Sequence, residues 1–446
     1  MSVVANQQRT FLRLAAALRP HWRTDPALPA RLQQLLARDR AFGSRDRRLY
    51  RELLYTTLRH LPWIEPRLDR DPAEAAAIVA WLAADTPATA RYRAETLAAG
   101  AWPACPATVA GRTAVLAARL GPGAALPVPL PEWFRTHCPE AFVPPDLDAL
   151  LARAPLWLRL QTDAPARVTD EFATRGWRWR ASSVLPSALE LLDEVDITPT
   201  ESFARGLVEI QDLGSQLLLA SAGLGTGPDP AGTRWLDACA GAGGKTLQLA
   251  RLLGPGSHVD AHDIRPAALA ELAARATRAG IAQVPAIGES RGGPVAESLD
   301  RRLAPPGATP RAAATLSILP RLEPGRLYDG VLVDAPCSGS GTWRRAPHLK
   351  WVTTEARIAE AATTQLALLH AHAPRVRPGG RLIYATCSLS HVENADVAAA
   401  FLAAHPEFSA EPPARDFGAL RTGAGLTFLP ARHDTDGFFV ATFRRR

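Results

Sequence analysis

From about residue 201 to the C-terminus, short apolar segments alternate with segments of helical periodicity. The apolar segments GTRWLDACAG, HVDAHDI, YDGVLVDAP and RLIYATCSL predict strands, whereas KTLQLARLLG and PAALAELAARATRAG predict helices between them. Strand–helix alternation of this kind favours an α/β fold with a doubly wound, mostly parallel sheet. Ligands of such sheets bind beyond the carboxyl ends of the strands, so the residues that follow each strand are the functional candidates.

The N-terminal part of the chain has a different pattern. Apolar residues recur at helical spacing through residues 1–125 and predict an all-helical domain. A proline-rich break follows, and residues 126–200 mix helical segments with PLWLRLQT, whose alternation predicts a strand. The 446 residues are therefore expected to form a helical domain, a small α+β linker subdomain and a domain over 201–446, with an insertion loop at about 290–325.

The charge balance is basic. The chain has 51 Lys and Arg residues against 44 Asp and Glu, a net charge of +7. This surplus suits a polyanionic partner, and a solvated basic surface explains it equally well. Six arginines lie close together in the helical region, where they either contact RNA phosphates or form a solvated helix face: Arg38, Arg40, Arg45, Arg47, Arg48 and Arg51.

Cysteine use indicates a reducing compartment. The five cysteines form no CxxC pair, so neither a disulfide framework nor a zinc site is expected. No secretory signal is expected from the N-terminal residues, and no uncharged run reaches the ~18 residues that span a bilayer. We therefore expect a cytoplasmic protein without a membrane association, whose thiols stay available for chemistry.

Lysine is almost absent. Only Lys245 and Lys350 occur, against 51 − 2 = 49 arginines, and Asn6 and Asn394 are the only asparagines. In a chain so rich in arginine, a remaining lysine indicates a position where a planar guanidinium does not replace a compact ammonium. Chance survival is the alternative.

The first motif is a glycine-rich turn between a strand and a helix, DACAGAGGKT at 237–246. Its glycines allow a tight turn close to a ligand, and the helix N-terminus offers N–H groups to a carboxylate. The spacing is neither GxGxxG nor that of a P-loop, so a nucleoside that carries an amino acid, such as S-adenosylmethionine, fits better than a phosphate. Lys245 is expected to hold that carboxylate or to orient the loop. A plain structural turn is the alternative.

Two acidic residues follow later strands. Asp263 ends HVDAHDI, where a carboxylate accepts hydrogen bonds from ribose hydroxyls, although strand ends often carry Asp as a cap. Glu289 lies near the expected end of a third strand and is a candidate for facing the adenine. A solvated loop glutamate explains it equally well.

The remaining motifs bring a cysteine to two further strand ends. Asp334 lies near the end of YDGVLVDAP, Cys337 directly follows this segment, and Cys387 lies near the end of RLIYATCSL. A free cysteine is more often a small buried residue than a nucleophile. Ser390 and Glu393 fit the S-x-x-E capping box of a following helix, and an active-site role for Glu393 is the alternative.

The segment after Cys337, WRRAPHLKW, is a candidate RNA contact. Its basic side chains offer positive charge to a nucleic-acid backbone, and its tryptophans either stack on bases or pack in the core. These residues are Trp343, Arg344, Arg345, His348, Lys350 and Trp351.

Together, DACAGxGGKT, DAPCSGSGTWRR and YATCSLSxxEN resemble the RNA cytosine-5 methyltransferase family, also described as Nop2/Sun or Fmu/RsmB-like. The resemblance covers roughly residues 201–446. LRLQT and ESFARGLVEIQDLGSQL resemble its linker, and GSRDRRLYRELLYTTLR is similar to its NusB-like RNA-binding domain. Ala242 stands where the family usually has proline, and Gln161 where it usually has asparagine.

The resemblance implies a Rossmann-like S-adenosylmethionine-dependent methyltransferase. It implies that Cys387 attacks carbon 6 of cytosine, that Cys337 assists release and that Asp334 hydrogen-bonds the cytosine edge. A base inside a helix must be flipped out or already unpaired. The cofactor-binding residues implied are Cys239, Ala240, Gly241, Ala242, Gly243, Gly244, Lys245, Asp263, Glu289 and Asp334.

The sequence thus predicts a monomer that methylates carbon 5 of cytosine in RNA, with small-subunit (16S) ribosomal RNA favoured over transfer RNA. Three alternatives stay open. DNA cytosine-5 methyltransferases use a cysteine that follows proline, which favours Cys337 as nucleophile and DNA as substrate. A non-catalytic RNA-binding assembly factor and a methyltransferase acting on a small molecule are the others.

Overall fold

The computed structural model describes residues 2–98, 100–121, 123–225, 232–285 and 313–446. Over these ranges the chain divides into two units. One comprises Met1–Ala154 together with Gly339–Arg357, and the other comprises Pro155–Ser338 and Ile358–Arg446. The expected boundaries near residues 125 and 200 do not coincide with this division. Residues 339–357 fold with the N-terminal helices, which the pattern along the sequence did not indicate.

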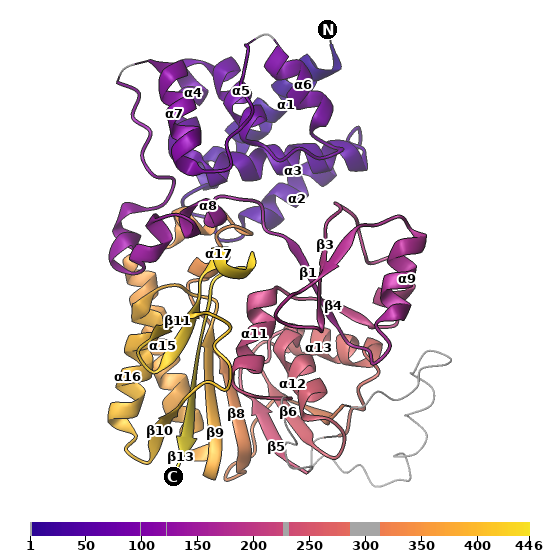
Figure 1. The fold of residues 1–446 in the computed structure, drawn as a ribbon, viewed down its shortest axis with the longest axis vertical. Coiled ribbons are helices and arrows are strands. Elements are labelled where there is room, and N and C mark those ends of the chain that lie inside the picture. Colours follow the sequence, from indigo (N-terminus) through magenta and orange to yellow (C-terminus); the bar gives the residue numbers. More distant parts are fainter. Residues whose placement is uncertain (1, 99, 122, 226–231, 286–312) are drawn as a thin grey trace. The chain divides into compact units, whose positions relative to one another are not determined.

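The first unit is helical, as the apolar periodicity predicts (Figure 1, indigo to purple). Its core consists of large apolar side chains on the inner helix faces, among them Phe11, Trp63 and Trp81, each at most 1% exposed. The helices are α1 (Val3–Leu18), α2 (Leu28–Arg38), α3 (Ser44–Arg59), α4 (Leu61–Arg70), α5 (Pro72–Leu82), α6 (Ala90–Ala98), α7 (Val109–Leu120), α8 (Asp146–Leu150) and α14 (Leu349–Val352).

The second unit begins with a small antiparallel sheet in the order β2-β3-β1-β4. Its strands are β1 (Leu156–Leu160), β2 (Trp179–Ala181), β3 (Ala188–Leu191) and β4 (Val208–Ile210), with the helices α9 (Ala166–Thr174) and α10 (Glu201–Ala204) between them. The strand predicted from PLWLRLQT is β1, at the centre of this sheet. Apolar side chains of β1, β3 and α9, including Leu158, Leu189 and Phe172, form a separate small core.

The larger sheet has the order β11-β12-β13-β9-β8-β5-β6-β7, with β10 paired to β13. The pairs among β5, β6, β7, β8 and β9 are parallel, whereas β13 runs antiparallel to β9. The strands are β5 (Arg234–Asp237), β6 (His258–His262), β7 (Thr315–Leu319), β8 (Tyr328–Asp334), β9 (Val376–Thr386), β10 (Phe408–Glu411), β11 (Leu420–Thr422), β12 (Gly425–Phe428) and β13 (Phe438–Arg445). The predicted doubly wound α/β fold is confirmed.

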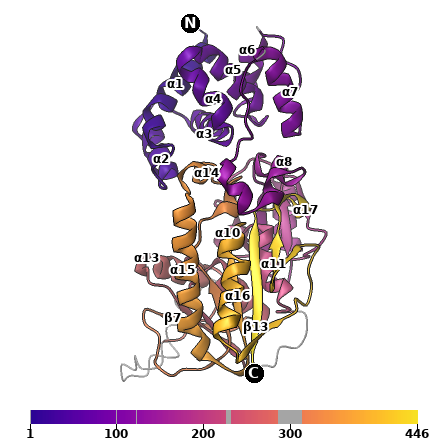
Figure 2. The same ribbon diagram turned by 90° about the vertical axis from the view of Figure 1, so that its left-hand side faces the viewer.

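Helices cover both faces of this sheet. In Figure 1, α11 (Leu213–Ser221), α12 (Gly244–Leu253) and α13 (Pro266–Arg278) lie on one side, and α15 (Glu355–His372) and α16 (Ala395–Ala404) on the other, which faces the viewer in Figure 2. Successive strand residues point to opposite faces. Leu332 accordingly packs with α11–α13, whereas Val331 and Val333 pack with α15 and α16.

The predicted insertion needs a correction. Residues 313–325 are described, and Thr315–Leu319 form β7, the outermost parallel strand, inside the stretch predicted as a structureless loop. This strand is only five residues long and lies in a region rich in Pro, Arg and Ala, where its short apolar pattern is not visible. Glu289 falls outside the described residues. Within the described ranges, no helix is long and apolar enough to cross a bilayer.

Candidate active site

The order of the parallel strands reverses between β5 and β8. Ligands of open α/β sheets bind at such a point, in the crevice beyond the carboxyl ends of the strands. Lys245 lies at the start of α12, directly after the β5 turn, and Asp334 is the last residue of β8. Lys245 Nζ donates a hydrogen bond to Asp334 Oδ2 over 2.8 Å across this point. Burial alone would lower the pKa of the Lys245 ammonium, but the attraction of Asp334 outweighs it and the pKa is raised. The lysine is therefore a fixed cation at the switch point.

The glycine-rich turn has the conformation that its glycines suggest. Gly241 and Gly243 have φ values of +54° and +92°, and a Cβ on Gly243 would overlap the side chain of Leu272. Two arginines hold the carbonyl groups of the turn. Arg275 Nη1 donates to Ala242 O, and Arg159 Nη1 to Gly244 O, each over 2.7 Å.

Neither arginine was identified from the sequence, because one comes from α13 and the other from β1, in the small sheet. Arg159 is 3% exposed, and burial lowers its pKa to about 9. These contacts fix the shape of the turn before any ligand binds.

Asp263 follows β6 beside the turn, as predicted. Its Oδ2 accepts a hydrogen bond from Gly241 N over 2.9 Å, which links the two strand ends. The guanidinium of Arg265 donates to both carboxylate oxygens, also over 2.9 Å. These bonds, the one from Arg265 foremost, lower the pKa of Asp263 to about 2, so the carboxylate is ionised at neutral pH.

These residues fit S-adenosylmethionine. Asp263 is an ionised acceptor for ribose hydroxyls, and the first turn of α12 offers N–H groups to a carboxylate. A Cβ added to Gly244 meets no atom within 4 Å, so there is open space beside the turn. Asp263 and the loop 239–245 would hold the cofactor. Lys245 pairs with Asp334 in this structure.

Two buried groups at the end of β5 are not nucleophiles. Asp237 is 1% exposed and accepts a hydrogen bond from Thr246 Oγ1 over 2.7 Å, and burial raises its pKa to about 7. Burial and the neighbouring carboxylates raise the pKa of Cys239, so its thiol stays protonated at neutral pH. This leaves the other two cysteines of the motifs as the reactive candidates.

Cys337 and Cys387 lie side by side at the ends of β8 and β9. Their Sγ atoms are 3.2 Å apart although 50 residues separate them in the chain, and both side chains are half-buried. Parallel pairing of β8 with β9 places Asp334 opposite Ala385, which brings the two loops together. The sequence motifs that contain the cysteines therefore share one site with Asp334 and Lys245.

The predicted capping box at Ser390 is wrong. Ser390 makes no side-chain cap, and the Glu393 carboxylate instead accepts hydrogen bonds from Ser338 and Ser388, which follow the two cysteines. The site role that was left as the alternative for Glu393 agrees with these contacts. Local spacing suggested the cap because the true partners, one of them 55 residues away in the sequence, come together only in the folded sheet.

The predicted RNA contacts after Cys337 also need correction. Lys350 is fully buried within the helical unit, where Nζ donates to Arg59 O over 2.8 Å and to Pro129 O over 3.0 Å. Trp343, Arg344 and His348 are buried as well. The segment cannot offer these side chains to phosphates because they are buried. Arg344, His348 and Lys350 instead make hydrogen bonds to backbone carbonyl groups inside the unit. Arg345 is exposed.

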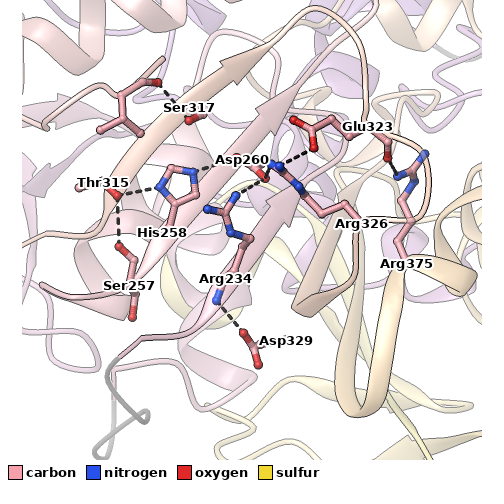
Figure 3. Close-up of polar contacts among 11 residues, drawn as sticks. Arg234, Ser257, His258, Asp260, Thr315, Ser317, Glu323, Arg326, Asp329 and Arg375 are labelled. Carbon is pink, nitrogen blue, oxygen red and sulfur yellow. Dashed lines mark hydrogen bonds and ion pairs between the residues drawn. The ribbon is translucent and has the colours of Figure 1, made fainter. Parts of the chain in front are cut away.

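A second polar cluster lies at the amino ends of the same strands (Figure 3). Asp260 is fully buried, and its Oδ2 pairs with Arg234 at 3.0 Å and Arg326 at 3.2 Å, while Oδ1 is 2.8 Å from His258 Nε2. These charges neutralise one another at the edge of the sheet opposite to the crevice, so the cluster is structural. Among the described residues, no group of His, Cys, Asp and Glu has an arrangement that holds a metal ion.

Comparisons with known proteins find similarity to methyltransferases. Residues 312–444 match the family described as "16S rRNA methyltransferase RsmB/F". The "Probable ribosomal RNA small subunit methyltransferase B" of Synechocystis sp. is 33% identical over 271 residues, which cover 59% of this chain and 54% of that protein. The chain thus spans about half the length of this curated relative.

Solved structures share the fold. PH0851 covers 100% of both chains with a TM-score of 0.67 at 20% identity. "NSun6 from Pyrococcus horikoshii with SFG" aligns with 70% of this chain and 97% of its own, with a TM-score of 0.55 at 17% identity. These likenesses show that the second unit has the Rossmann-like fold of those structures.

Proposed function

Because the chain carries a domain of the RsmB/F methyltransferase family over residues 312–444, we propose that it methylates carbon 5 of cytosine in RNA. The observation that supports this most strongly is the 3.2 Å separation of the Cys337 and Cys387 thiols, beside Asp334 at the crevice. Carbon 5 of cytosine is a weak nucleophile, so the reaction needs covalent activation of the ring. A pair of cysteines and a carboxylate at one site supplies groups for attack, release and recognition.

In the proposed reaction, the Cys387 thiolate forms a bond to carbon 6, and the electrons of the 5,6 double bond move to carbon 5. Bound S-adenosylmethionine supplies the electrophilic methyl group that carbon 5 takes up. A base removes the carbon 5 proton, the double bond forms again and the bond between Cys387 and carbon 6 breaks. Cys337 assists this release at its 3.2 Å distance from Cys387 Sγ. Asp334 hydrogen-bonds the cytosine edge.

We propose RNA as the substrate and the helical unit as the part that binds it. The six clustered arginines of α2, α3 and the loop between them are all exposed, and none forms an ion pair within the described residues. Such side chains attract a phosphate backbone. The printed names of the relatives favour small-subunit ribosomal RNA. We take the protein to act as a monomer in the cytoplasm, whose reducing conditions keep both thiols available.

The order of the two cysteines is tested on a denaturing gel with substrate RNA and S-adenosylmethionine. We expect Cys337→Ala to accumulate a covalent protein–RNA adduct because release is impaired. Cys387→Ala should form no adduct and transfer no methyl group. An adduct that forms only with Cys387→Ala would reverse the assignment and favour Cys337 as the nucleophile.

Two measurements separate the alternatives. Methyl transfer to cytosine in DNA in preference to RNA would favour a DNA enzyme, and calorimetry that detects no S-adenosylmethionine binding would favour a non-catalytic assembly factor. Bisulfite sequencing of RNA from a deletion strain then identifies the nucleotide. We expect one cytosine of small-subunit ribosomal RNA to lose its methyl group, and a loss confined to transfer RNA would refute the ribosomal assignment.

A further inference from the structure

One buried carboxylate connects the two cysteine loops. Glu393 is fully buried, and its carboxylate accepts hydrogen bonds from the backbone N–H and the hydroxyl of Ser338, over 2.8 and 2.5 Å. The same carboxylate accepts a hydrogen bond from Ser388 Oγ over 2.6 Å and one from Gln365 Nε2 over 3.1 Å. Ser338 directly follows Cys337, and Ser388 directly follows Cys387.

Two neighbouring amides hold the loops from their other sides. Gln365 Nε2 also donates to Pro336 O over 3.0 Å, so Cys337 is held both before and after its own position. Asn394 Nδ2 donates to Ser388 O over 2.9 Å, and its Oδ1 accepts from Thr386 Oγ1 over 2.6 Å. Asn394 is one of the two asparagines in the chain, and it uses both its donor and its acceptor here.

We infer that Glu393 is a positioning residue that sets the separation between the Cys337 and Cys387 thiols. The part these thiols play in methyl transfer rests on the proposed function, whereas the control of their separation does not. The chemistry of the site requires a carboxylate in particular. An ionised carboxylate is an acceptor only, with lone pairs for about four hydrogen bonds, and it meets four donors here. An amide NH2 group at this position would face either the Ser338 N–H and the Gln365 amide, which only donate here, or the two serine hydroxyls, which would have to turn round and accept.

The separation of the thiols can be measured without methyl transfer. Diamide accepts two electrons and two protons from a pair of thiols, which become a disulfide while its N=N bond becomes a hydrazine. Cys337 and Cys387 must approach from 3.2 Å to the bonding distance, so the rate of disulfide formation reports their positions. Mass spectrometry of the linked peptides follows this one disulfide, and the other three cysteines are counted by alkylation.

We expect the wild-type protein to form the Cys337–Cys387 disulfide readily. Glu393→Gln should form it more slowly, by up to about 100-fold, since a displacement of about 1 Å between positioned groups has effects of that order on bond formation. S-adenosylhomocysteine affinity should not change, because Glu393 does not contact the cofactor turn. The control is Asp396→Asn, three residues later in the first turn of α16, whose exposed side chain pairs with His391. This variant should oxidise at the wild-type rate.

If Glu393→Gln oxidises like the wild type while binding S-adenosylhomocysteine normally, the inference is wrong. If Glu393→Gln does not fold, the oxidation rate of the double variant Ser338→Ala, Ser388→Ala tests the inference in its place. Slower oxidation supports the positioning role, and an unchanged rate overturns it. The two proposals can fail separately. If Glu393→Gln abolishes the rapid oxidation seen in the wild type, but the wild type transfers no methyl group to cytosine, the proposed function is refuted and the positioning role stands.

Discussion

Both carboxylate oxygens of Asp263 accept hydrogen bonds from the guanidinium of Arg265, each over 2.9 Å. The backbone N–H groups of Gly241 and Arg265 donate to the same two oxygens. A carboxylate has about four lone-pair positions, so all of them are used. The ribose hydroxyls that Asp263 is proposed to hold need two of these positions, and the exposed guanidinium is the group that can leave.

We therefore predict that Arg265→Gln binds S-adenosylhomocysteine more tightly than the wild type. The Arg265 side chain is 67% exposed, so its pair with Asp263 stabilises by about 0.2–1 kcal/mol, and the gain should be no more than about fivefold. Isothermal titration calorimetry measures it, with Arg45→Gln in the helical unit as a control. Weaker binding by Arg265→Gln would show instead that the arginine contacts the cofactor.

The stability of the protein should depend on the protonation of Asp237. Burial raises the pKa of this carboxyl to about 7 in the folded protein, against about 3.9 in an unfolded chain. The folded state therefore binds the Asp237 proton more tightly than the unfolded state does. The contribution of this proton to the free energy of unfolding is complete below pH 4 and is lost as the pH rises to 7.

Asp237→Asn removes that dependence because an amide does not titrate, and its Oδ1 can still accept from Thr246. Relative to the wild type, the variant should gain stability between pH 4 and pH 8, by no more than about 4 kcal/mol. Urea unfolding at the two pH values measures the difference. A pH-independent difference would refute the assignment of this transition to Asp237.

The clustered arginines should determine how RNA affinity depends on salt. Each phosphate contact that is lost lowers the slope of log K against log salt by about 1. The triple variant Arg45→Gln, Arg47→Gln, Arg48→Gln should therefore lower the slope by up to about 3 in filter-binding assays. Three exposed arginines that already pair with carboxylates give a matched control: Arg175, Arg178 and Arg180. If replacing these three arginines by glutamine lowered the salt slope equally, a specific RNA surface on α2 and α3 would be refuted.

Lys350 should not be replaceable by arginine. Its ammonium is fully buried between the carbonyl groups of Arg59 and Pro129, and a guanidinium is larger and planar. Lys350→Arg should therefore destabilise the protein by about 1–3 kcal/mol through overpacking. Exposed Arg345→Lys, five residues earlier, should change stability by less than about 0.5 kcal/mol. Guanidinium unfolding measures both, and equal midpoints would contradict the prediction.

The sequence predicted those features whose signals are local. Strands β5, β6, β8 and β9 contain apolar runs, each with an aspartate or cysteine at its end or directly after it, and each was expected where it occurs. Because parallel strands carry their ligands at one edge, Asp334, Cys337 and Cys387 were expected to meet, and the structure brings them together. The family resemblance was confirmed by the match of residues 312–444.

Features that depend on distant partners were not predictable in this way. Strand β7 is held by its neighbour β6 rather than by a pattern of its own, and Glu393 fits a helix cap in sequence while its donors come from three other segments. The burial of Lys350 follows from carbonyl groups more than 200 residues earlier in the chain. Composition singled out Lys350 by its rarity, but composition does not distinguish a phosphate contact from an internal one.

The inclusion of residues 339–357 in the helical unit has a consequence for synthesis on the ribosome. The first 154 residues emerge long before their last partners, because 338 − 154 = 184 residues must be made in between. At roughly 5–20 residues per second this delay lasts about 10–40 s. Until it ends, Phe134 lacks the Trp343 ring that lies 4.5 Å from it in the finished protein. The N-terminal helices thus leave the ribosome as an incomplete unit, and a nascent-chain chaperone has a defined interval in which to act.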